Sequence, residues 1–357
     1  MKALIGIPNG EILMLMLDHK FLSEKMTEVL KEINISSESI YYLVNCLIQT
    51  SLRGIDSHGI NLFPHYYRVA NTGRINKSPN IRVIKTGQST AIIDGDHAYG
   101  HHAGAVGMMT AIELSRETGI GATVVKNSSH FAAASYYGLM AAKNDMIGFA
   151  FTNANALVKA YGSSETYFGT NPICFTAPIM DEEPLCLDMA TSLTNRNKIK
   201  NYERENKSIP SNWAYDDKGK ATTDPSKVAM LSPIGEYKGF GLGMMVDVLC
   251  SLLAGGLFSK HIQEMYENLN NKRYISHCFI AIRIENFVAL NKFKSNLKKM
   301  VSEVRNLPTL DGIEHVMVPG DPEKYKMLER TKYGIPIDEQ KFIEFLQISS
   351  DFKKVVK

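Results

Sequence analysis

The spacing of hydrophobic residues predicts that the chain begins with two helices. In the segment Leu22–Asn34, the side chains of Met26, Val29 and Leu30 recur at helical spacing and fall on one face. The next segment, Ser36–Leu52, starts with serines suited to helix capping and carries a second apolar stripe. Both segments are therefore expected to be amphipathic helices.

Beyond residue 80, strands and helices are predicted to alternate. The expected strands are Ile81–Lys85, Thr90–Ile93, Ala122–Val125, Ile147–Thr152, Pro172–Ala177, Leu185–Leu187 and His277–Ile282. The expected helices are Ala103–Glu117, Ala132–Lys143, Gly239–Ala254, Phe287–Val304 and Asp338–Leu346. This alternation favours a domain of the α/β class.

The predicted elements divide the chain into three parts. Residues 1–18 are expected to form a loosely attached N-terminal extension, and residues 81–304 an α/β domain that binds cofactor and substrate. Neither end of the chain alone carries enough apolar residues for a complete core. We therefore expect residues 19–80 and 305–357 to pack together as a helical accessory domain.

Composition and charge argue against several classes of protein. With 357 residues, of which 44% are hydrophobic, the chain can bury a substantial core. The 40 Lys and Arg residues nearly balance the 37 Asp and Glu residues, and like charges do not form long runs. Neither a nucleic-acid-binding stripe nor a basic membrane-binding patch is therefore indicated.

The cysteines and the longest apolar segments favour a soluble protein in a reducing compartment. The five cysteines are widely spaced without a CxxC pair, so we expect buried thiols, which suits the cytoplasm. The apolar segment Ile12–Leu17 is too short for the core of a signal peptide. Phe240–Phe258 is long enough to span a bilayer, but Asp247 near its centre favours a helix buried in a globular core.

The usual dinucleotide-binding fingerprint is absent. That motif, GxGxxG, follows a strand and precedes an acidic residue by about 20 positions. The nearest match, Gly239-Phe-Gly-Leu-Gly243, follows a loop and lacks the spacing of the third glycine. Helix packing is the simpler interpretation of these glycines, so a Rossmann fold is not favoured.

Two histidines lie in loops between apolar elements, where catalytic groups are often found. His58 shares one turn with Asp56 and Ser57, and Gly59 frees the backbone there. His130 follows a predicted strand and opens a predicted helix, whose dipole would favour the neutral imidazole. A neutral imidazole near physiological pH can act as a general base. For both histidines, a purely structural role is an equal alternative.

Other polar groups lie in three further places. The side-chain amides of Asn153, Asn155 and Asn171 could hold a carboxylate or a cofactor amide, or serve ordinary turns. Asp188 ends a short apolar strand, where it could bind a ribose hydroxyl, orient a histidine or cap the next helix. Lys238 precedes the predicted buried helix, where it suits a phosphate or a carboxylate.

The order of these clusters resembles the malate/L-lactate dehydrogenase family, which lacks a Rossmann fold. Five motifs carry the resemblance in register along the chain. They are Arg53-Gly-Ile-Asp-Ser-His-Gly59, Asn127-Ser-Ser-His-Phe131, Phe168-Gly-Thr-Asn-Pro172, Leu187-Asp-Met-Ala-Thr-Ser192 and Tyr237-Lys-Gly-Phe-Gly241. The resemblance runs from about residue 20 to the end of the chain and includes Pro319-Gly-Asp321.

The resemblance implies a non-Rossmann, mixed-sheet α/β fold with a helical accessory domain, a homodimer, and NAD or NADP as the cofactor. It further implies that His130 is the proton acceptor. The residues implied at the substrate are Ser57, His58, Tyr66 and Asn171. The residues implied at the cofactor are Asn153, Asp188, Met189, Ala190, Lys238, Gly320 and Asp321.

The resemblance also implies a small 2-hydroxy acid or 2-oxo acid as the substrate. Malate and oxaloacetate are preferred over lactate, ureidoglycolate and cyclic imino acids. Several family members have an arginine four residues after the first histidine, where it suits a substrate carboxylate, but this chain has Leu62. Another group must then bind the carboxylate. A second departure is Asn197, which replaces a glycine usually found just before Lys198.

Two alternatives from other functional classes stay open. A metal-dependent hydrolase or lyase would use His58, His130 and Asp188 as ligands. A non-catalytic protein of the same fold would bind a metabolite without converting it. His101 and His102 lie in a glycine-rich turn without a carboxylate at metal-ligand spacing, so we interpret both as structural.

Overall fold

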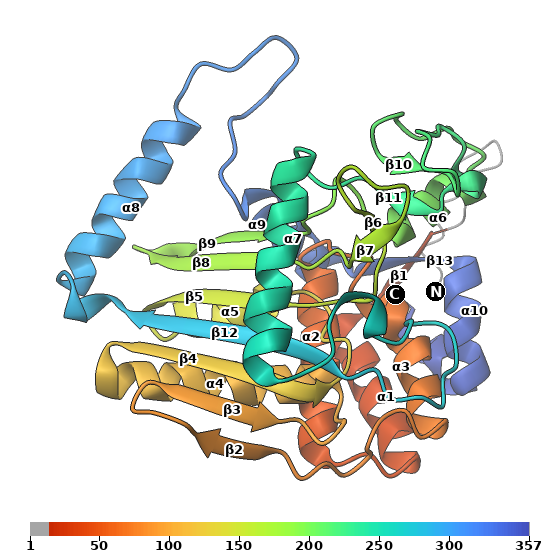
Figure 1. Ribbon diagram of the computed structural model, residues 1–357, viewed down its shortest axis with the longest axis horizontal. Coiled ribbons are helices and arrows are strands. Elements are labelled where there is room, and N and C mark those ends of the chain that lie inside the picture. The colour runs from red at the N-terminus through yellow and green to blue at the C-terminus, as the bar shows by residue number, and fades with distance from the viewer. Residues whose placement is uncertain (1–13, 357) are drawn as a thin grey trace.

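The computed structural model describes residues 14–356, which form a mixed α/β fold around a seven-stranded sheet (Figure 1). Its strands follow the order β2 (Arg82–Lys85), β3 (Thr90–Asp94), β4 (Ile120–Ser128), β12 (Ile275–Arg283), β5 (Met146–Thr152), β8 (Ile173–Ile179) and β9 (Glu182–Met189). In this sheet β3 and β4 run parallel, and the other neighbours run antiparallel. The mixed α/β class is confirmed, and these seven strands are the seven that the sequence predicts.

Helices cover both faces of this sheet. α4 (Gly100–Thr118) and α5 (Ser135–Ala142) pack on one face, and α7 (Tyr237–Asp247) crosses the other (Figure 1). α4 lies so close to β4 that a Cβ atom on Gly121 would come within 2.0 Å of the Ala111 carbonyl oxygen. Glycine at this position therefore sets the spacing between the helix and the sheet.

The predicted helix Gly239–Ala254 is present but changes geometry half-way. α7 ends at Asp247, and the chain continues as a π-helical turn, η3 (Val248–Leu252). Asp247 is buried and accepts a hydrogen bond from the Ser251 hydroxyl. Within residues 14–356, no helix combines the length and apolar character needed to cross a membrane.

The two ends of the chain pack together beside the sheet (Figure 1). The helices there are α1 (His19–Glu32), α2 (Ser37–Leu52), α3 (Phe63–Asn71) and α10 (Glu339–Ile348), and the strands are β1 (Met14–Leu17) and β13 (Ile335–Asp338). Their buried apolar side chains form one continuous cluster. This shared cluster supports the proposed accessory domain built from both ends.

The predicted loose extension is wrong for its last residues. Residues 1–13 lie outside the part of the chain that the structure describes. Met14–Leu17, however, pairs antiparallel with β13, and Leu17 is fully buried. The end of the apolar segment Ile12–Leu17 is therefore a strand anchored in the terminal core.

A second, smaller sheet and three helices were not predicted. The sheet has the order β10 (Ala214–Tyr215), β11 (Met230–Leu231), β6 (Val158–Lys159) and β7 (Thr166–Phe168). The helices are α3, α6 (Arg196–Arg204) and α9 (Asp321–Tyr333). The buried side chains are Ile199 in α6 and Asp321 and Arg330 in α9. With so little apolar periodicity, these two helices leave almost no hydrophobic pattern to detect.

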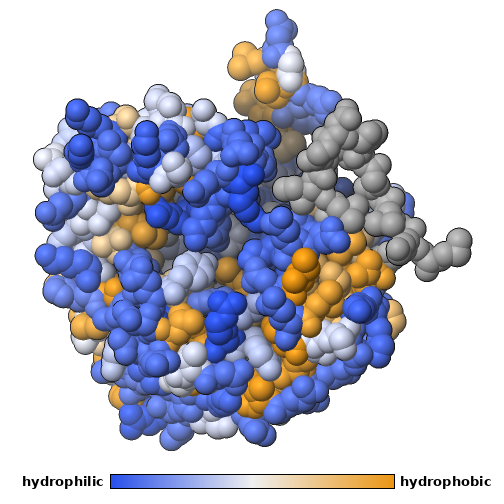
Figure 2. All heavy atoms as spheres, turned by 90° about the vertical axis from the view of Figure 1, so that its right-hand side faces the viewer, coloured by the Kyte–Doolittle hydropathy of each residue, from blue (hydrophilic) through white to orange (hydrophobic). Residues whose placement is uncertain are grey.

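One segment stands away from the body of the molecule. After α8 (Leu290–Arg305), residues 306–317 project outward before the chain returns to α9 (Figure 1). Leu310 in this segment is 80% exposed. In Figure 2 the same projection rises above a face on which hydrophilic side chains surround several hydrophobic patches.

Candidate active site

His130 lies in the turn between β4 and α5. The Tyr66 hydroxyl oxygen is 2.6 Å from its Nδ1 atom, and the His58 ring stacks on it with the two ring centroids 5.6 Å apart. Nε2 of His130 has no hydrogen-bond partner within the described residues and is therefore available to a ligand. The structure thus brings His130 next to two residues, His58 and Tyr66, from a distant part of the sequence.

The surroundings of His130 favour its neutral form. Burial lowers the pKa of His130 well below its usual value, and the charges of His58 and Arg273 lower it further. The sequence predicts a neutral His130 as well, but on the basis of a helix dipole. α5 begins only at Ser135, so burial is the main cause.

The loop that carries His58 is held by two helices. Ser57 Oγ lies 2.8 Å from His58 Nδ1, and burial lowers the pKa of His58 to about 4. Asp56 forms a two-pronged ion pair with Arg330 of α9. The Asn197 amide, in α6, donates to the Ser57 carbonyl oxygen. Asn197 therefore lies within α6 and ties this helix to the loop that carries His58.

Tyr66 lies on α3, is 2% exposed and points its hydroxyl at His130. The Tyr99 hydroxyl donates to its carbonyl oxygen, and the His101 ring packs edge to face with the Tyr66 ring, with centroids 4.7 Å apart. Burial raises the pKa of Tyr66 well above its usual value, so the phenol stays protonated at neutral pH. His101 packs against this tyrosine, which fits its predicted structural role.

Arg273 is a site residue that the sequence interpretation missed. It is 4% exposed; its Nε donates to the Gln263 carbonyl oxygen and its Nη2 to Asn155 Oδ1. Nη1 has no hydrogen-bond partner within residues 14–356. Burial lowers the pKa of Arg273 to about 10, so it remains a cation at neutral pH. Its only sequence signal is the basic pair Lys272-Arg273 in a polar segment.

The end of β9 lies beside the turn of His130. The Asp188 carboxylate accepts a hydrogen bond from the Ser135 N–H, at the first residue of α5, at 2.7 Å. Burial raises the pKa of Asp188. Met189 and Ala190 follow, both partly exposed. Asp188 therefore anchors the helix that follows His130, while the next two residues remain accessible to a ligand.

The beginning of α7 is linked to the same strand end through backbone contacts. The Ile234 N–H donates to the Thr191 carbonyl oxygen, just after β9. A Cβ atom on Gly239 would lie 2.2 Å from the Ile234 carbonyl oxygen, so this turn requires glycine. Lys238 is exposed and has no ion-pair partner in the described part of the chain.

These elements fit a nicotinamide dinucleotide. A helix N-terminus with an adjacent lysine suits the pyrophosphate, because N–H groups and the helix dipole both favour an anion. The accessible residues Met189 and Ala190 lie between this helix and the turn of His130. The first turn of α7 and the imidazole of His130 therefore lie on connected elements.

Two residues predicted to contact ligands, Asn153 and Asn171, bond to other parts of the chain. Asn171 is fully buried; it accepts the Ala154 N–H and donates to the Gly243 carbonyl oxygen. Asn153 is 2% exposed and bonds to Ser251 Oγ, the Leu257 carbonyl oxygen and the Ser276 N–H. Protein groups bond to both ends of each amide, so both residues hold neighbouring segments together. The substrate contact of Asn171 and the cofactor contact of Asn153 stay predictions.

Asp321, predicted to contact the cofactor, also bonds within the protein, and its cofactor role stays a prediction. Its carboxylate, 3% exposed, is bound by two guanidinium nitrogens of Arg305 and by the Val318 N–H. Gly320, with φ of 97°, packs on β9 so closely that a Cβ atom would lie 3.2 Å from the Cys186 nitrogen. The contacts of Gly320 and Asp321 therefore hold the start of α9 against β9.

The described residues offer no support for the metal-dependent alternative. No group of three or more His, Cys, Asp or Glu side chains in residues 14–356 is placed to hold a metal ion. His58 and His130 do lie together, and their Nδ1 atoms face Ser57 and Tyr66. The five cysteines are buried and free, as predicted.

Comparisons with known proteins agree on one family. A family model described as malate/L-lactate dehydrogenase matches residues 17–345. A malate dehydrogenase from Pyrococcus abyssi is 37% identical over 334 residues, which cover 91% of each chain. A ureidoglycolate dehydrogenase (NAD(+)) from Escherichia coli O157:H7 is 31% identical over 89% of this chain and 90% of its own. The crystal structure of malate dehydrogenase from Entamoeba histolytica has a TM-score of 0.90 at 32% identity, covering 95% of this chain and 98% of that chain.

Proposed function

The chain belongs to the malate/L-lactate dehydrogenase family, and on this premise we propose that it interconverts malate and oxaloacetate with NAD or NADP. As a member of this family it is a dehydrogenase of small hydroxy acids. The observation that carries the proposal is the neutral imidazole of His130, held by Tyr66 and placed near the partly unpaired cation Arg273.

His130 accepts and returns the proton of the substrate hydroxyl group. In malate oxidation, the free Nε2 accepts the hydroxyl proton, while Nδ1–H donates to the Tyr66 oxygen. In oxaloacetate reduction, the imidazolium returns that proton from Nε2. A nicotinamide cofactor, when bound, would supply the hydride chemistry at the adjacent carbon. We assign its binding to Asp188, Met189, Ala190 and Lys238.

Arg273 is proposed to bind a substrate carboxylate in place of the arginine that Leu62 replaces. Leu62 is 7% exposed and apolar, so it offers no donor. Arg273 keeps Nη1 unpaired, and a charge-assisted hydrogen bond to a carboxylate would satisfy it. His58 and Ser57, on the loop that stacks against His130, are proposed to contact the remaining oxygen atoms.

The charge around the site supports a dicarboxylate. Arg74 is 2% exposed and bonds only to carbonyl oxygens of residues 265–268 in the described chain. With Arg273, it makes two buried cations whose partners are all uncharged. A substrate with two negative charges offsets this charge better than one with a single charge, which favours malate over lactate.

A screen of 2-oxo acids against both reduced cofactors tests the proposal. Oxidation of NADH and NADPH is followed by absorbance with oxaloacetate, pyruvate and a cyclic imino acid, and the reverse reaction with malate and ureidoglycolate. Oxaloacetate and malate are expected to give the highest kcat/KM. Faster conversion of pyruvate would overturn the dicarboxylate assignment, and activity lost in EDTA would support a metal enzyme.

A homodimer is proposed from the exposed face of α7 and η3. Met244, Val248 and Leu252 follow at intervals of four residues and are 47%, 43% and 56% exposed. Such an apolar stripe on the surface suits a second copy of the chain. Sedimentation of the wild type and of Val248→Glu tests this: dissociation of the variant supports it.

The five buried thiols support the proposal that the protein works in the cytoplasm.

A further inference from the structure

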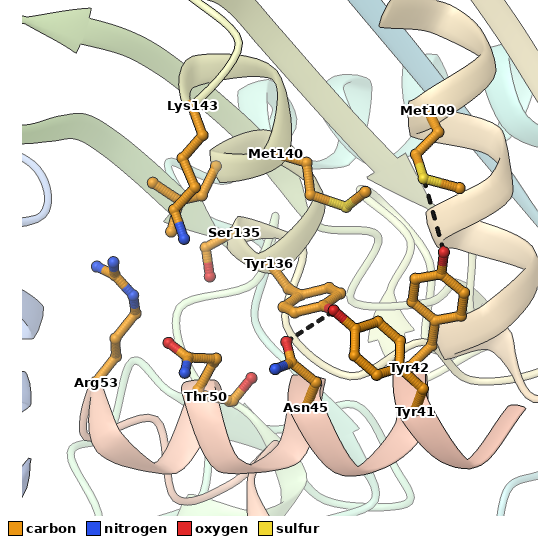
Figure 3. A pocket seen from close by; sticks show the side chains of 12 residues that line it. Tyr41, Tyr42, Asn45, Thr50, Arg53, Met109, Ser135, Tyr136, Met140 and Lys143 are labelled. Atoms are coloured by element: carbon orange, nitrogen blue, oxygen red, sulfur yellow. Dashed lines mark hydrogen bonds between the residues drawn. The ribbon is translucent and has the colours of Figure 1, made fainter. Parts of the chain in front are cut away.

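A groove between α2 and α5 lies apart from the residues assigned to catalysis (Figure 3). Its volume is about 380 Å³, within the range of small-molecule sites. α2 forms one wall and α5 the other, and Met109 of α4 closes one end. The lining does not include His130, His58, Tyr66 or Arg273.

One end of the groove is aromatic and apolar. Tyr42, Tyr136, Met109 and Met140 lie there (Figure 3). The Tyr42 hydroxyl contacts the Met109 sulfur at 3.6 Å, and the Tyr136 hydroxyl donates to Asn45 Oδ1 at 3.0 Å. Because the hydroxyls are already bonded, this end offers mainly ring surfaces and methionine side chains, which suit a flat apolar group.

The other end is cationic. Arg53 is 7% exposed, and its Nη2 pairs with Glu183 at 2.7 Å. Lys143 faces the same end from the C-terminus of α5 and has no ion-pair or hydrogen-bond partner within residues 14–356. The Gln49 amide, also in the lining, likewise has no partner among the described residues. The donors at this end therefore exceed the acceptors that the chain supplies.

We propose that this groove binds a small organic anion that carries a flat ring. Its anionic group lies between Arg53 and Lys143 and accepts a hydrogen bond from Gln49. Its ring packs against Tyr42, Tyr136 and the methionines. A phosphate on a nucleoside and a carboxylate on an aromatic ring share this chemistry.

Calorimetric titration of the full-length protein tests the proposal. The probes are adenosine monophosphate for the phosphate form and indole-3-carboxylate for the carboxylate form. The protein is first saturated with whichever of NADH and NADPH it binds, so that the adenine ring cannot enter the cofactor site. Saturable binding of at least one probe is expected, and the tighter probe identifies the anion.

Three variants locate the binding. Lys143→Met keeps the aliphatic stem, removes the charge and is expected to weaken binding about tenfold or more. Gln49→Trp fills the groove and is expected to abolish binding. Lys31→Met, on the exposed side of α1, is the matched control and should bind as the wild type does. The proposal is overturned if neither probe binds saturably, or if Lys143→Met and Gln49→Trp bind like the control; thermal unfolding of each variant verifies that it is folded.

Discussion

Charged side chains near the two ends of β9 are arranged in contrasting ways. At its first residue, Glu182 shares a network with Arg305, Asp321 and Lys324, in which each cation contacts a carboxylate. Beyond its last residue, around His130, the cation Arg273 hydrogen-bonds to a carbonyl and an amide oxygen and forms no ion pair within residues 14–356. The first cluster is complete without a ligand, and the second is not.

This contrast separates a structural cluster from a functional one. A buried charge without an opposite charge is costly, so it persists where a ligand supplies the missing partner. A carboxylate bound at Arg273 would provide that negative charge. It would also oppose the effect that keeps the pKa of His130 low, and so would help the imidazole accept a proton when substrate is present.

The largest effect is expected from removing the imidazole of His130, which lies near the unpaired cation Arg273. His130→Ala should lower kcat by roughly 10²–10⁴-fold, because it removes the proposed acceptor of the hydroxyl proton. Cofactor affinity should stay the same, since the residues assigned to the cofactor are unchanged. Steady-state kinetics measure kcat, and titration of the cofactor followed by fluorescence measures its affinity.

The matched control for this variant is His315→Ala, in the exposed segment 306–317. Its kcat should equal that of the wild type. Near-normal turnover of His130→Ala would remove His130 from the mechanism, whatever the control shows.

The next largest effect is expected at the cation itself. Arg273→Met should lower kcat/KM for oxaloacetate by roughly 100-fold, because a buried charge-assisted hydrogen bond to the substrate is lost. Arg273→Lys keeps the charge and should recover part of this loss. Arg82→Met removes an exposed arginine that pairs with Asp94 and serves as the control. Equal kcat/KM in Arg273→Met and the wild type would show that the carboxylate is bound elsewhere.

The difference between the two clusters also explains what the sequence predicts well. His58 and His130 lie in motifs, next to strand and helix ends, so their positions follow from local patterns. The seven strands of the large sheet follow from continuous apolar runs. By contrast, the charged side chains of Arg273 and Asp321 carry no sign in the sequence of which groups they bind. Their roles depend on partners that are brought near only by the fold.

The side-chain amides illustrate the same limit. Asn153 and Asn171 follow strands, as ligand-binding amides often do, yet both bond to backbone atoms of distant segments. An amide that binds a ligand and one that binds a carbonyl oxygen have the same sequence signature. The polar helices α6 and α9 were missed for a related reason, since ion pairs and hydrogen bonds rather than an apolar face hold them in place.

A smaller effect is expected from the contact that orients His130. Tyr66→Phe removes the hydroxyl and leaves Nδ1 of a half-buried imidazole without its partner, so kcat should fall about tenfold while KM changes little. Tyr42→Phe, which removes a hydroxyl bonded only to the Met109 sulfur, is the matched control. A KM effect without a kcat effect would mean that Tyr66 binds substrate directly.

The pH dependence sharpens the comparison further. Because the pKa of His130 lies well below the usual 6.5, the free enzyme keeps its base form as pH falls through that value. For malate oxidation, kcat/KM should therefore stay nearly flat where an ordinary histidine would lose about tenfold per pH unit. For oxaloacetate reduction, kcat/KM should rise as pH falls, because the imidazole must take up a proton. A decline of malate oxidation centred near 6.5 would contradict the buried, cationic setting.

The smallest effect on catalysis, and the clearest on stability, is expected at the paired cluster. Burial would raise the pKa of Asp321, but hydrogen bonds from Arg305 and the Val318 N–H outweigh it and lower the pKa below 3.8. Since the folded pKa is below the unfolded one, Asp321 stabilises the fold above the unfolded pKa and loses that contribution as pH falls through the folded pKa. Asp321→Asn should therefore cost about 1–3 kcal/mol of unfolding free energy at neutral pH, and less in acid, with kcat/KM within about twofold of the wild type. Denaturant unfolding at neutral and acid pH measures the loss of unfolding free energy. The control is Asp351→Asn, which removes an exposed carboxylate. If Asp321→Asn instead weakened cofactor binding at unchanged stability, the cluster at the start of β9 would be part of the cofactor site. The distinction between paired and unpaired charges would then not identify function in this fold.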